Sequence, residues 1–297
     1  MKAELAWRQW LPDFVLLAML WGSSFLFTRE AALEFGPFAT AFLRISLGAA
    51  AITPWLVWRG QLSWLPREWR RLTLSGAINS AIPFACYGYA LLSISTGLSS
   101  ILNACTPLFG TLIARLWLGT PLVPSRMVDL GLGFAGVVAL VTGRQHLQWQ
   151  ASAPAILACL VATVCYGAAG CYSSKYLAHI PSAASATGSL WGATLLLAPL
   201  AWWSWPTQMP SMHAWLSVLV AGVLSTALAY VLYFRLLMLA GPTRSMTVTY
   251  LIPVFANALG VIVLDEEITV WMLGCAGVIL LGTALASGLI GRTRAAR

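Results

Sequence analysis

Apolar residues run along this chain in long stretches, which short groups of charged residues, prolines and glycines interrupt. A helix that crosses the hydrocarbon core of a bilayer needs about 20 mostly apolar residues. Cutting the sequence at the interruptions predicts an all-α polytopic membrane protein with ten transmembrane helices and short connections. The predicted spans cover roughly residues 12–32, 37–58, 71–92, 97–118, 126–143, 152–172, 182–203, 213–236, 241–264 and 269–289.

The second half of the chain repeats the apolar pattern of the first. Pro199 lies 145 residues after Pro54, and Pro253 lies 146 residues after Pro107. The basic stretch 59–71 nevertheless corresponds to the segment 202–215, which contains no Lys or Arg. A repeat that keeps its hydrophobic pattern but loses its basic loop indicates two halves inserted in opposite orientations, an organisation typical of transporters. We therefore predict a 5+5 inverted-topology repeat, with one five-helix half at 1–147 and the inverted half at 148–297.

Composition and charge favour the same class of protein. The chain is 59% hydrophobic and 9% charged, whereas soluble domains carry about 25% charged residues. Its net charge of +8 comes mainly from short loops, where the positive-inside rule places Lys and Arg, so we expect no nucleic-acid partner. Of the 17 Lys and Arg residues, three fall away from the predicted cytoplasmic side: Arg29, Arg44 and Arg144. We predict a multi-pass protein of the bacterial inner membrane with both termini cytoplasmic.

The sequence offers no constellation for catalysis or for a cofactor. Its 6 Cys residues lie inside apolar runs without a CxxC pair, and its 3 His residues lie far apart near loops. An intramembrane enzyme needs a Ser–His pair, paired aspartates or a similar arrangement within its spans, and the sequence has none. We therefore predict neither an enzyme nor a metal site, and no cofactor.

Several short motifs resemble those of a known family. The first span contains Trp21-Gly22-Ser23-Ser24-Phe25, Arg44 lies early in the second, and the fourth contains Thr106-Pro107-Leu108. With ten spans in two halves, the chain resembles the drug/metabolite transporter superfamily, and most closely its EamA-type exporters, among them bacterial aromatic amino acid exporters. The resemblance implies alternating access and a central cavity lined mainly by the first, third, fourth, sixth, eighth and ninth spans. One departure is that the Gly-Glu pair common after the fourth span is Gly119-Thr120 here, while the second half has Asp265-Glu266.

Polar, aromatic and helix-breaking residues inside the spans are the candidates for substrate binding. Such residues are costly in lipid unless they face protein or a water-filled cavity. Tyr166 corresponds to Trp21 under the 145-residue offset, which suggests aromatic surfaces at equivalent depth in both halves. The repeat-related Pro107 and Pro253 are candidate hinges, or alternatively bend their helices for packing. The candidate cavity residues are Trp21, Ser24, Asn79, Tyr87, Asn103, Tyr166, Trp191 and Tyr250.

Two further features have structural interpretations. Arg44 lies inside a predicted span, where it either pairs with Glu30 or Glu34 or meets a substrate carboxylate, and the sequence favours the ion pair. The segment 133–138 in the fifth span mirrors 274–279 in the tenth, and both are rich in small residues. Small residues let helices approach closely. The fifth and tenth spans are therefore predicted to pack together or to form the contact of a homodimer.

The lack of acidic residues at the centre of the predicted spans bears on the transport mechanism. Asp13 and Asp129 lie at span ends, and the other acidic residues lie in loops or near the N-terminus. Proton- and sodium-coupled transporters usually need an intramembrane Asp, Glu or His, so the sequence favours facilitated diffusion or exchange. We predict a membrane transporter, an exporter or facilitator, of small neutral or zwitterionic metabolites. Amino acids, including aromatic and hydrophobic ones, fit best; the alternatives are a proton-coupled drug/metabolite antiporter and a channel-like pore.

Overall fold

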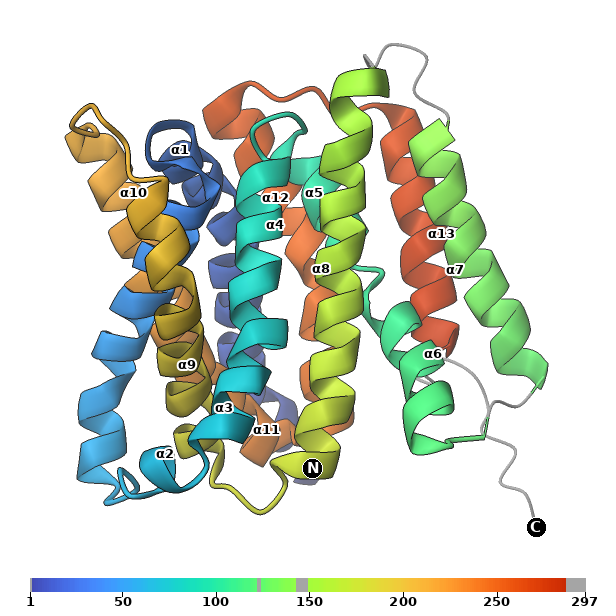
Figure 1. Ribbon diagram of the computed structural model, residues 1–297. Helices are drawn as coiled ribbons and strands as arrows, with labels where there is room; N and C mark the ends of the chain where they lie inside the picture. Colours follow the sequence, from blue (N-terminus) through green and yellow to red (C-terminus); the bar gives the residue numbers. More distant parts are fainter. Residues whose placement is uncertain (1, 122–123, 143–148, 287–297) are drawn as a thin grey trace.

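The computed structural model describes residues 2–121, 124–142 and 149–286, and in these ranges the chain forms helices and no strands. The helices stand side by side as a bundle (Figure 1). Five are long and apolar enough to cross a membrane, and three shorter apolar helices accompany them. The first of the five holds two predicted spans, and the third predicted span is divided into shorter helices. The predicted all-α membrane fold is confirmed.

The first two spans form one helical element, α1 (Lys2–Trp58), which bends sharply at Gly36. Gly36 has a φ of 76° and a ψ of 168°, a conformation that glycine adopts without the steric cost of a Cβ atom. Pro37 follows and disfavours a helical conformation in the residue before it. The chain therefore reverses direction at Gly36, within the predicted connection between residues 32 and 37.

The third and eighth spans each contain a π-helical segment. After the short α2 (Trp64–Arg67), the third span comprises α3 (Trp69–Gly76), η1 (Ala77–Ala81) and α4 (Ile82–Ala90). The eighth comprises α10 (Met212–Gly222), η2 (Val223–Leu228) and α11 (Ala229–Met246). The two π segments begin 146 positions apart, so they occupy equivalent places in the two halves. The sequence did not predict them.

The fourth span is broken near its middle. It consists of α5 (Thr96–Asn103) and α6 (Thr106–Leu118), separated by Ala104 and Cys105. Pro107 lies in the first turn of α6, where a backbone N–H has no intrahelical partner in any case. Pro107 therefore begins a helix after a break rather than interrupting the hydrogen bonding of a continuous one.

The ninth span begins later than predicted. Helix α11 continues to Met246, and α12 (Val248–Leu264) follows after Thr247, whereas the sequence placed this boundary between 236 and 241. A helix runs past the predicted break because open backbone groups are costly in lipid. Pro253 lies inside α12, where a proline removes one hydrogen bond of the helix.

Helices α6 and α12 end in the same way, at positions 146 residues apart. Their C-caps, Gly119 and Asp265, have left-handed φ values of 70° and 51°. The carboxylate of Glu266 accepts hydrogen bonds from the backbone N–H and the hydroxyl of Thr96, both 2.8 Å long, and it pairs with Arg29. A carboxylate is stabilised at a helix N-terminus, here that of α5. Glu266 thus ties the first, fourth and ninth spans together at one end of the bundle.

The remaining spans are α7 (Pro124–Thr142), α8 (Trp149–Tyr176), α9 (Ser182–Trp203) and α13 (Val270–Ala286). Helices α7 and α13 lie side by side (Figure 1). A Cβ atom added at Gly136 would lie 2.9 Å from the side chain of Ile279, and one at Gly282 would lie 2.7 Å from the Cα atom of Gly133. The predicted packing of the fifth span on the tenth is confirmed.

Each half contributes spans that pack against the other half. Gly76 in the third span lies against the backbone of α9 at Ser189 and Ala193. Its repeat counterpart Gly222 lies against the backbone of the second span, where an added Cβ atom would be 2.9 Å from the carbonyl oxygen of Arg44. Two glycine contacts related by the repeat therefore hold the halves together around the centre of the bundle.

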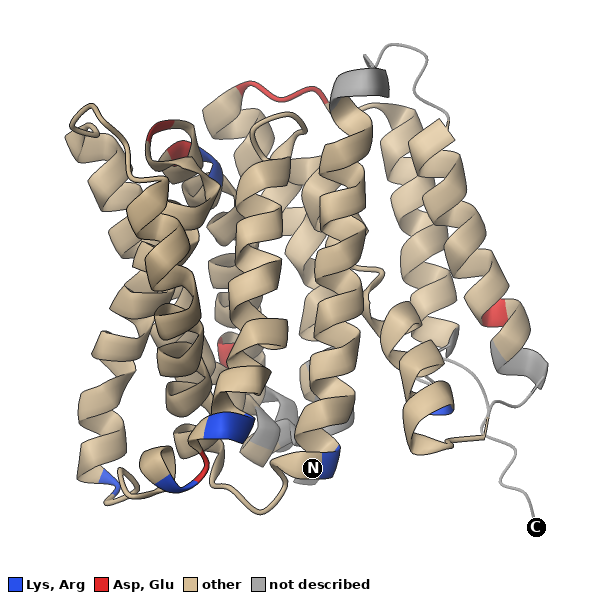
Figure 2. Cartoon of the chain, in the orientation of Figure 1, with Lys and Arg blue, Asp and Glu red and all other residues tan. Residues whose placement is uncertain are grey.

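Charged residues gather at the two ends of the bundle (Figure 2). Most of the described Lys and Arg lie at the end near the N-terminus, while the acidic segments 30–34 and 265–267 lie at the opposite end. Hydrogen bonds with His179 and Arg71 lower the pKa of Glu68. The hydroxyl and backbone N–H of Ser211 likewise lower the pKa of Glu34. Short polar contacts thus link neighbouring spans at both ends.

Candidate functional site

A cavity of about 630 Å³ lies between the two halves of the bundle. Residues of the first, third, fourth, sixth, eighth and ninth spans line it, with Arg44 from the second. The spans are those that the family resemblance implied. Ligand pockets typically have volumes of about 300–1,000 Å³, so the cavity has room for a small metabolite.

Seven of the eight residues predicted to line a cavity lie around this one, as does Pro107, one of the two candidate hinges. Trp191 is absent from the described lining; its indole N–H donates to the Thr53 hydroxyl over 3.0 Å. Pro253 is buried within α12 and is likewise absent from the described lining. The predicted residues that do line the cavity are Trp21, Ser24, Asn79, Tyr87, Asn103, Pro107, Tyr166 and Tyr250.

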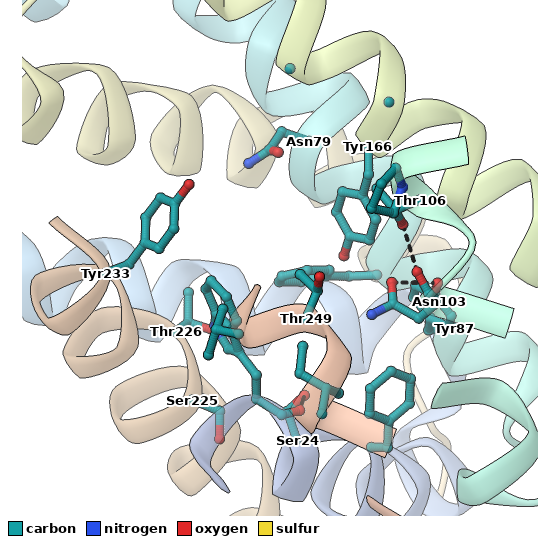
Figure 3. A pocket seen from close by; sticks show the side chains of 18 of the residues that line it. Ser24, Asn79, Tyr87, Asn103, Thr106, Tyr166, Ser225, Thr226, Tyr233 and Thr249 are labelled. Atoms are coloured by element: carbon teal, nitrogen blue, oxygen red, sulfur yellow. Dashed lines mark hydrogen bonds between the residues drawn. The ribbon is translucent and has the colours of Figure 1, made fainter. Parts of the chain in front are cut away.

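Hydrogen bonds fix several of the polar groups around the cavity. The Tyr87 hydroxyl donates to Asn103 Oδ1 over 2.9 Å, and the Thr106 hydroxyl donates to the Asn103 backbone carbonyl over 2.8 Å (Figure 3). The Asn79 amide donates to the Tyr230 hydroxyl over 3.1 Å. These bonds hold the third span against the fourth and the eighth. The break between α5 and α6 places Asn103 and Thr106 beside the cavity.

Aromatic rings form two groups around the cavity. Tyr87 lies between Phe25, with a ring-centroid distance of 5.4 Å, and Tyr166, at 6.3 Å with nearly parallel planes. Trp21 contacts Tyr233 at 5.5 Å. Figure 3 shows Tyr233 on one side of the cavity, with Tyr87 and Tyr166 on the other. The repeat-matched Trp21 and Tyr166 thus both line the cavity and contact different partners.

Sequence reasoning missed much of the eighth span, although the repeat carries a signal for it. Three lining residues of the third span have repeat counterparts, 146 positions later, that also line the cavity. The pairs are Asn79 with Ser225, Phe84 with Tyr230, and Tyr87 with Tyr233. Applying the offset to the lining residues of the third span therefore gives Ser225, Tyr230 and Tyr233 in the eighth, but not Thr226.

The two π segments lie at this cavity. Asn79 belongs to η1, and Ser225 and Thr226 belong to η2. The Thr226 hydroxyl donates to the Ala221 carbonyl, five residues earlier, over 2.9 Å. Single-turn π segments inside α-helices occur frequently at functional sites, because the altered register redirects side chains. Their equivalent positions in both halves make this cavity the candidate functional site.

The ion pair predicted for Arg44 is wrong. Glu30 contacts His213 at 3.0 Å, and Glu34 accepts hydrogen bonds from Ser211, so other groups occupy both predicted partners. Within the described ranges, no Asp or Glu forms an ion pair with Arg44. Arg44 is 7% exposed and lies at the cavity. No group of three or more metal-ligating side chains occurs in the part of the chain searched.

Both halves of the chain match one family. The model of the EamA-like transporter family matches residues 10–142 and again residues 153–288. The chain belongs to the EamA-like transporter family. The two matches divide the chain near the predicted middle, and this EamA-like protein is a membrane transporter rather than an enzyme.

Curated relatives of this EamA-like transporter are similar over nearly its whole length. A probable terminal-alkyne amino-acid exporter of Streptantibioticus cattleyicolor is 23% identical over 285 residues, which cover 90% of this chain and 91% of that protein. The uncharacterized transporter YvbV of Bacillus subtilis is 23% identical and covers 91% of this chain and 88% of its own. The uncharacterized inner membrane transporter YedA of Escherichia coli K12 is 23% identical, and the match covers 86% of this chain and 84% of YedA.

A solved structure shares the fold. One crystal structure superimposes on this EamA-like transporter with a TM-score of 0.65 over 93% of this chain and 96% of its own, at 21% sequence identity. The overall arrangement of helices is thus one that occurs in a solved structure.

Proposed function

We propose that this EamA-like transporter moves small neutral or zwitterionic metabolites, with amino acids, including aromatic and hydrophobic ones, as the best-fitting class. It acts as an exporter or facilitator by alternating access through the central cavity. A relative named as a probable amino-acid exporter supports this class. The chemistry of the cavity supports it independently.

The observation that carries the proposal is the combination of groups around the cavity. Aromatic rings of Trp21, Tyr87, Tyr166 and Tyr233 surround it, and Ser, Thr and Asn side chains interleave with them. Aromatic faces suit an apolar or cationic portion of a substrate, while amides and hydroxyls suit its polar atoms. Such a site favours a small amphipathic molecule over a polyanion, which needs several cations.

Alternating access requires spans that change shape. The break between α5 and α6, with Pro107 beside it, and Pro253 within α12 are the proposed hinges. Discontinuous helices in matched positions of two halves mark the binding region in several transporter folds. The contacts of Glu266 with Arg29 and Thr96 link spans at one end of the bundle, and we propose that they break when that end opens.

We place the protein in the bacterial inner membrane with both termini cytoplasmic. The gathering of described Lys and Arg at the N-terminal end supports this orientation. The exposed parts of α7 and α13 are the proposed contact of a homodimer, and native mass spectrometry of the detergent-solubilised protein measures the oligomeric state.

Reconstituted protein tests the proposed function directly. The purified transporter is reconstituted into liposomes that contain one unlabelled amino acid. Entry of the same amino acid in labelled form is then followed. We expect saturable uptake that an internal substrate accelerates, because a carrier returns its binding site faster when it is loaded. Flux that rises linearly with concentration indicates a channel-like pore and contradicts the proposal, with protein-free liposomes as the control.

We expect an imposed pH gradient to leave transport of a neutral amino acid unchanged. The described lining of the cavity has no Asp, Glu or His to carry a coupling proton. The measurement compares the steady-state accumulation of labelled substrate with and without an inward or outward gradient, at a fixed membrane potential. Accumulation that follows the proton gradient contradicts uncoupled transport and favours the proton-coupled antiporter.

A further inference from the structure

Arg44 is a buried cation without a carboxylate partner in the described chain. Its guanidinium lies 4.1 Å from the centroid of the Phe84 ring, and the residue is 7% exposed. A buried charge is normally paired or hydrogen-bonded, because removing it from water is costly. An ionisable residue inside a membrane therefore indicates a functional site with a specific partner.

Two threonine hydroxyls orient the guanidinium from neighbouring spans. Arg44 Nε donates to the Thr226 hydroxyl over 3.2 Å, and Arg44 Nη1 donates to the Thr28 hydroxyl over 2.9 Å. The Thr226 hydroxyl gives its own proton to the Ala221 carbonyl, so its lone pairs face the arginine. An arginine has five N–H donors, and these two bonds leave donors of a cavity-lining residue for another acceptor.

The position of Arg44 is asymmetric with respect to the repeat. Under the 145-residue offset that relates Pro54 to Pro199 in the same pair of spans, its counterpart is Ser189, a buried and uncharged residue. The aromatic lining is repeated in both halves, but the described lining has its positive charge in the first half alone. The cavity therefore has one cationic side, which can orient a substrate that bears a single negative group.

We propose that Arg44, held by Thr28 and Thr226, binds the carboxylate of the transported molecule and makes that carboxylate a requirement for transport. This inference rests on the proposed function and adds the residue that selects the substrate class. Arginine binds a carboxylate through two parallel N–H donors. Nearby aromatic rings then contact the remainder of the substrate, since Phe84 and Tyr87 belong to the same helix, α4.

A test on the unmodified protein compares three related molecules as competitors of labelled uptake. These are the amino acid transported best, its amide, and the amine left after removal of its carboxyl group. We expect the amide and the amine to compete at least about tenfold more weakly, since a hydrogen bond to a charged group contributes about that factor or more. Equal competition by all three molecules overturns the inference while leaving saturable transport intact.

Substitutions assign the selectivity to Arg44. Arg44→Leu removes the positive charge and its N–H donors, and we expect it to reduce the tenfold preference for the acid over its amide to nearly none. Arg44→Lys keeps a positive charge without the bidentate geometry, so it should retain part of the preference. Arg59→Gln changes an exposed loop arginine that stacks on Trp55, and it should leave the preference unchanged.

The outcomes separate the two proposals. An unchanged acid-to-amide preference in folded Arg44→Leu shows that Arg44 merely packs on Phe84 and overturns the inference. If Arg44→Leu fails to fold, Arg44→Lys and the competition series on the unmodified protein still decide the question. Absence of saturable uptake for every amino acid tested overturns the proposed function, and this inference with it.

Discussion

The substitution Gly76→Ala is expected to lower the yield of folded transporter sharply. Gly76 lies where the third span crosses α9, and an added Cβ atom would overlap the carbonyl oxygen of Ser189 and approach the Ala193 nitrogen to 2.8 Å. Both contacts are with backbone, which cannot rotate away as a side chain can. Overpacking of a well-packed interior costs about 1–3 kcal/mol and occasionally more.

The repeat provides a second variant with the same expected outcome. Gly222→Ala places a methyl group 2.9 Å from the Arg44 carbonyl oxygen and 2.8 Å from the Leu47 Cβ atom. We expect both variants to lower the melting temperature of the detergent-solubilised protein, measured by the fluorescence of its tryptophans. Because the two sites hold the halves together, their effects should be similar.

Gly131→Ala is the matched control. Gly131 also lies within a helix, but an added Cβ atom there meets nothing within 4 Å. Alanine is favoured over glycine in helices by about 0.5–1 kcal/mol, so this change should be neutral or slightly stabilising. Unchanged melting temperatures for Gly76→Ala and Gly222→Ala would show that the helices shift easily at both sites. That result would contradict a tight contact between the two halves at these glycines.

The spans and their order could be predicted because the bilayer imposes a length on every apolar run. The reversal at Gly36 falls in the predicted connection between residues 32 and 37, where a Gly-Pro pair has local backbone preferences. The repeat offset placed Trp21 and Tyr166 at one cavity, since equivalent positions lie at equivalent depth in the two halves. Local conformation and periodicity therefore account for the part of the site that was found.

The remainder depended on contacts between distant residues. The π segments need a particular register between neighbouring spans, and no residue type specifies it. Trp191 has the depth of a cavity residue but turns toward Thr53 in the second span. The sequence predicts an ion pair of Arg44 with Glu30 or Glu34, whereas His213 and Ser211 approach these acids from the eighth span. A choice among partners in different helices requires the packing itself.

The substitution Trp21→Ala is expected to weaken substrate transport without loss of folded protein. Trp21 lines the cavity and contacts Tyr233, at a ring-centroid distance of 5.5 Å. An aromatic contact adds about 0.5–1.5 kcal/mol to the effect of burial, so the KM for an aromatic or hydrophobic amino acid should rise about tenfold. Trp21→Phe keeps a ring at this position and should lose less. Tyr250→Ala, from the ninth span at the same cavity, should also raise KM.

The control for Trp21→Ala is Trp203→Ala at the end of α9. The Trp203 side chain is 91% exposed and does not belong to the described lining of the cavity. Initial rates of labelled uptake into liposomes give KM and the maximal rate, and size-exclusion chromatography measures the folded protein. An increase in KM restricted to Trp21→Ala and Tyr250→Ala would assign their rings to substrate binding, since general destabilisation lowers the active fraction and hence the maximal rate. Unchanged KM in both variants would remove the aromatic lining from the mechanism and leave recognition to Arg44 and the polar groups.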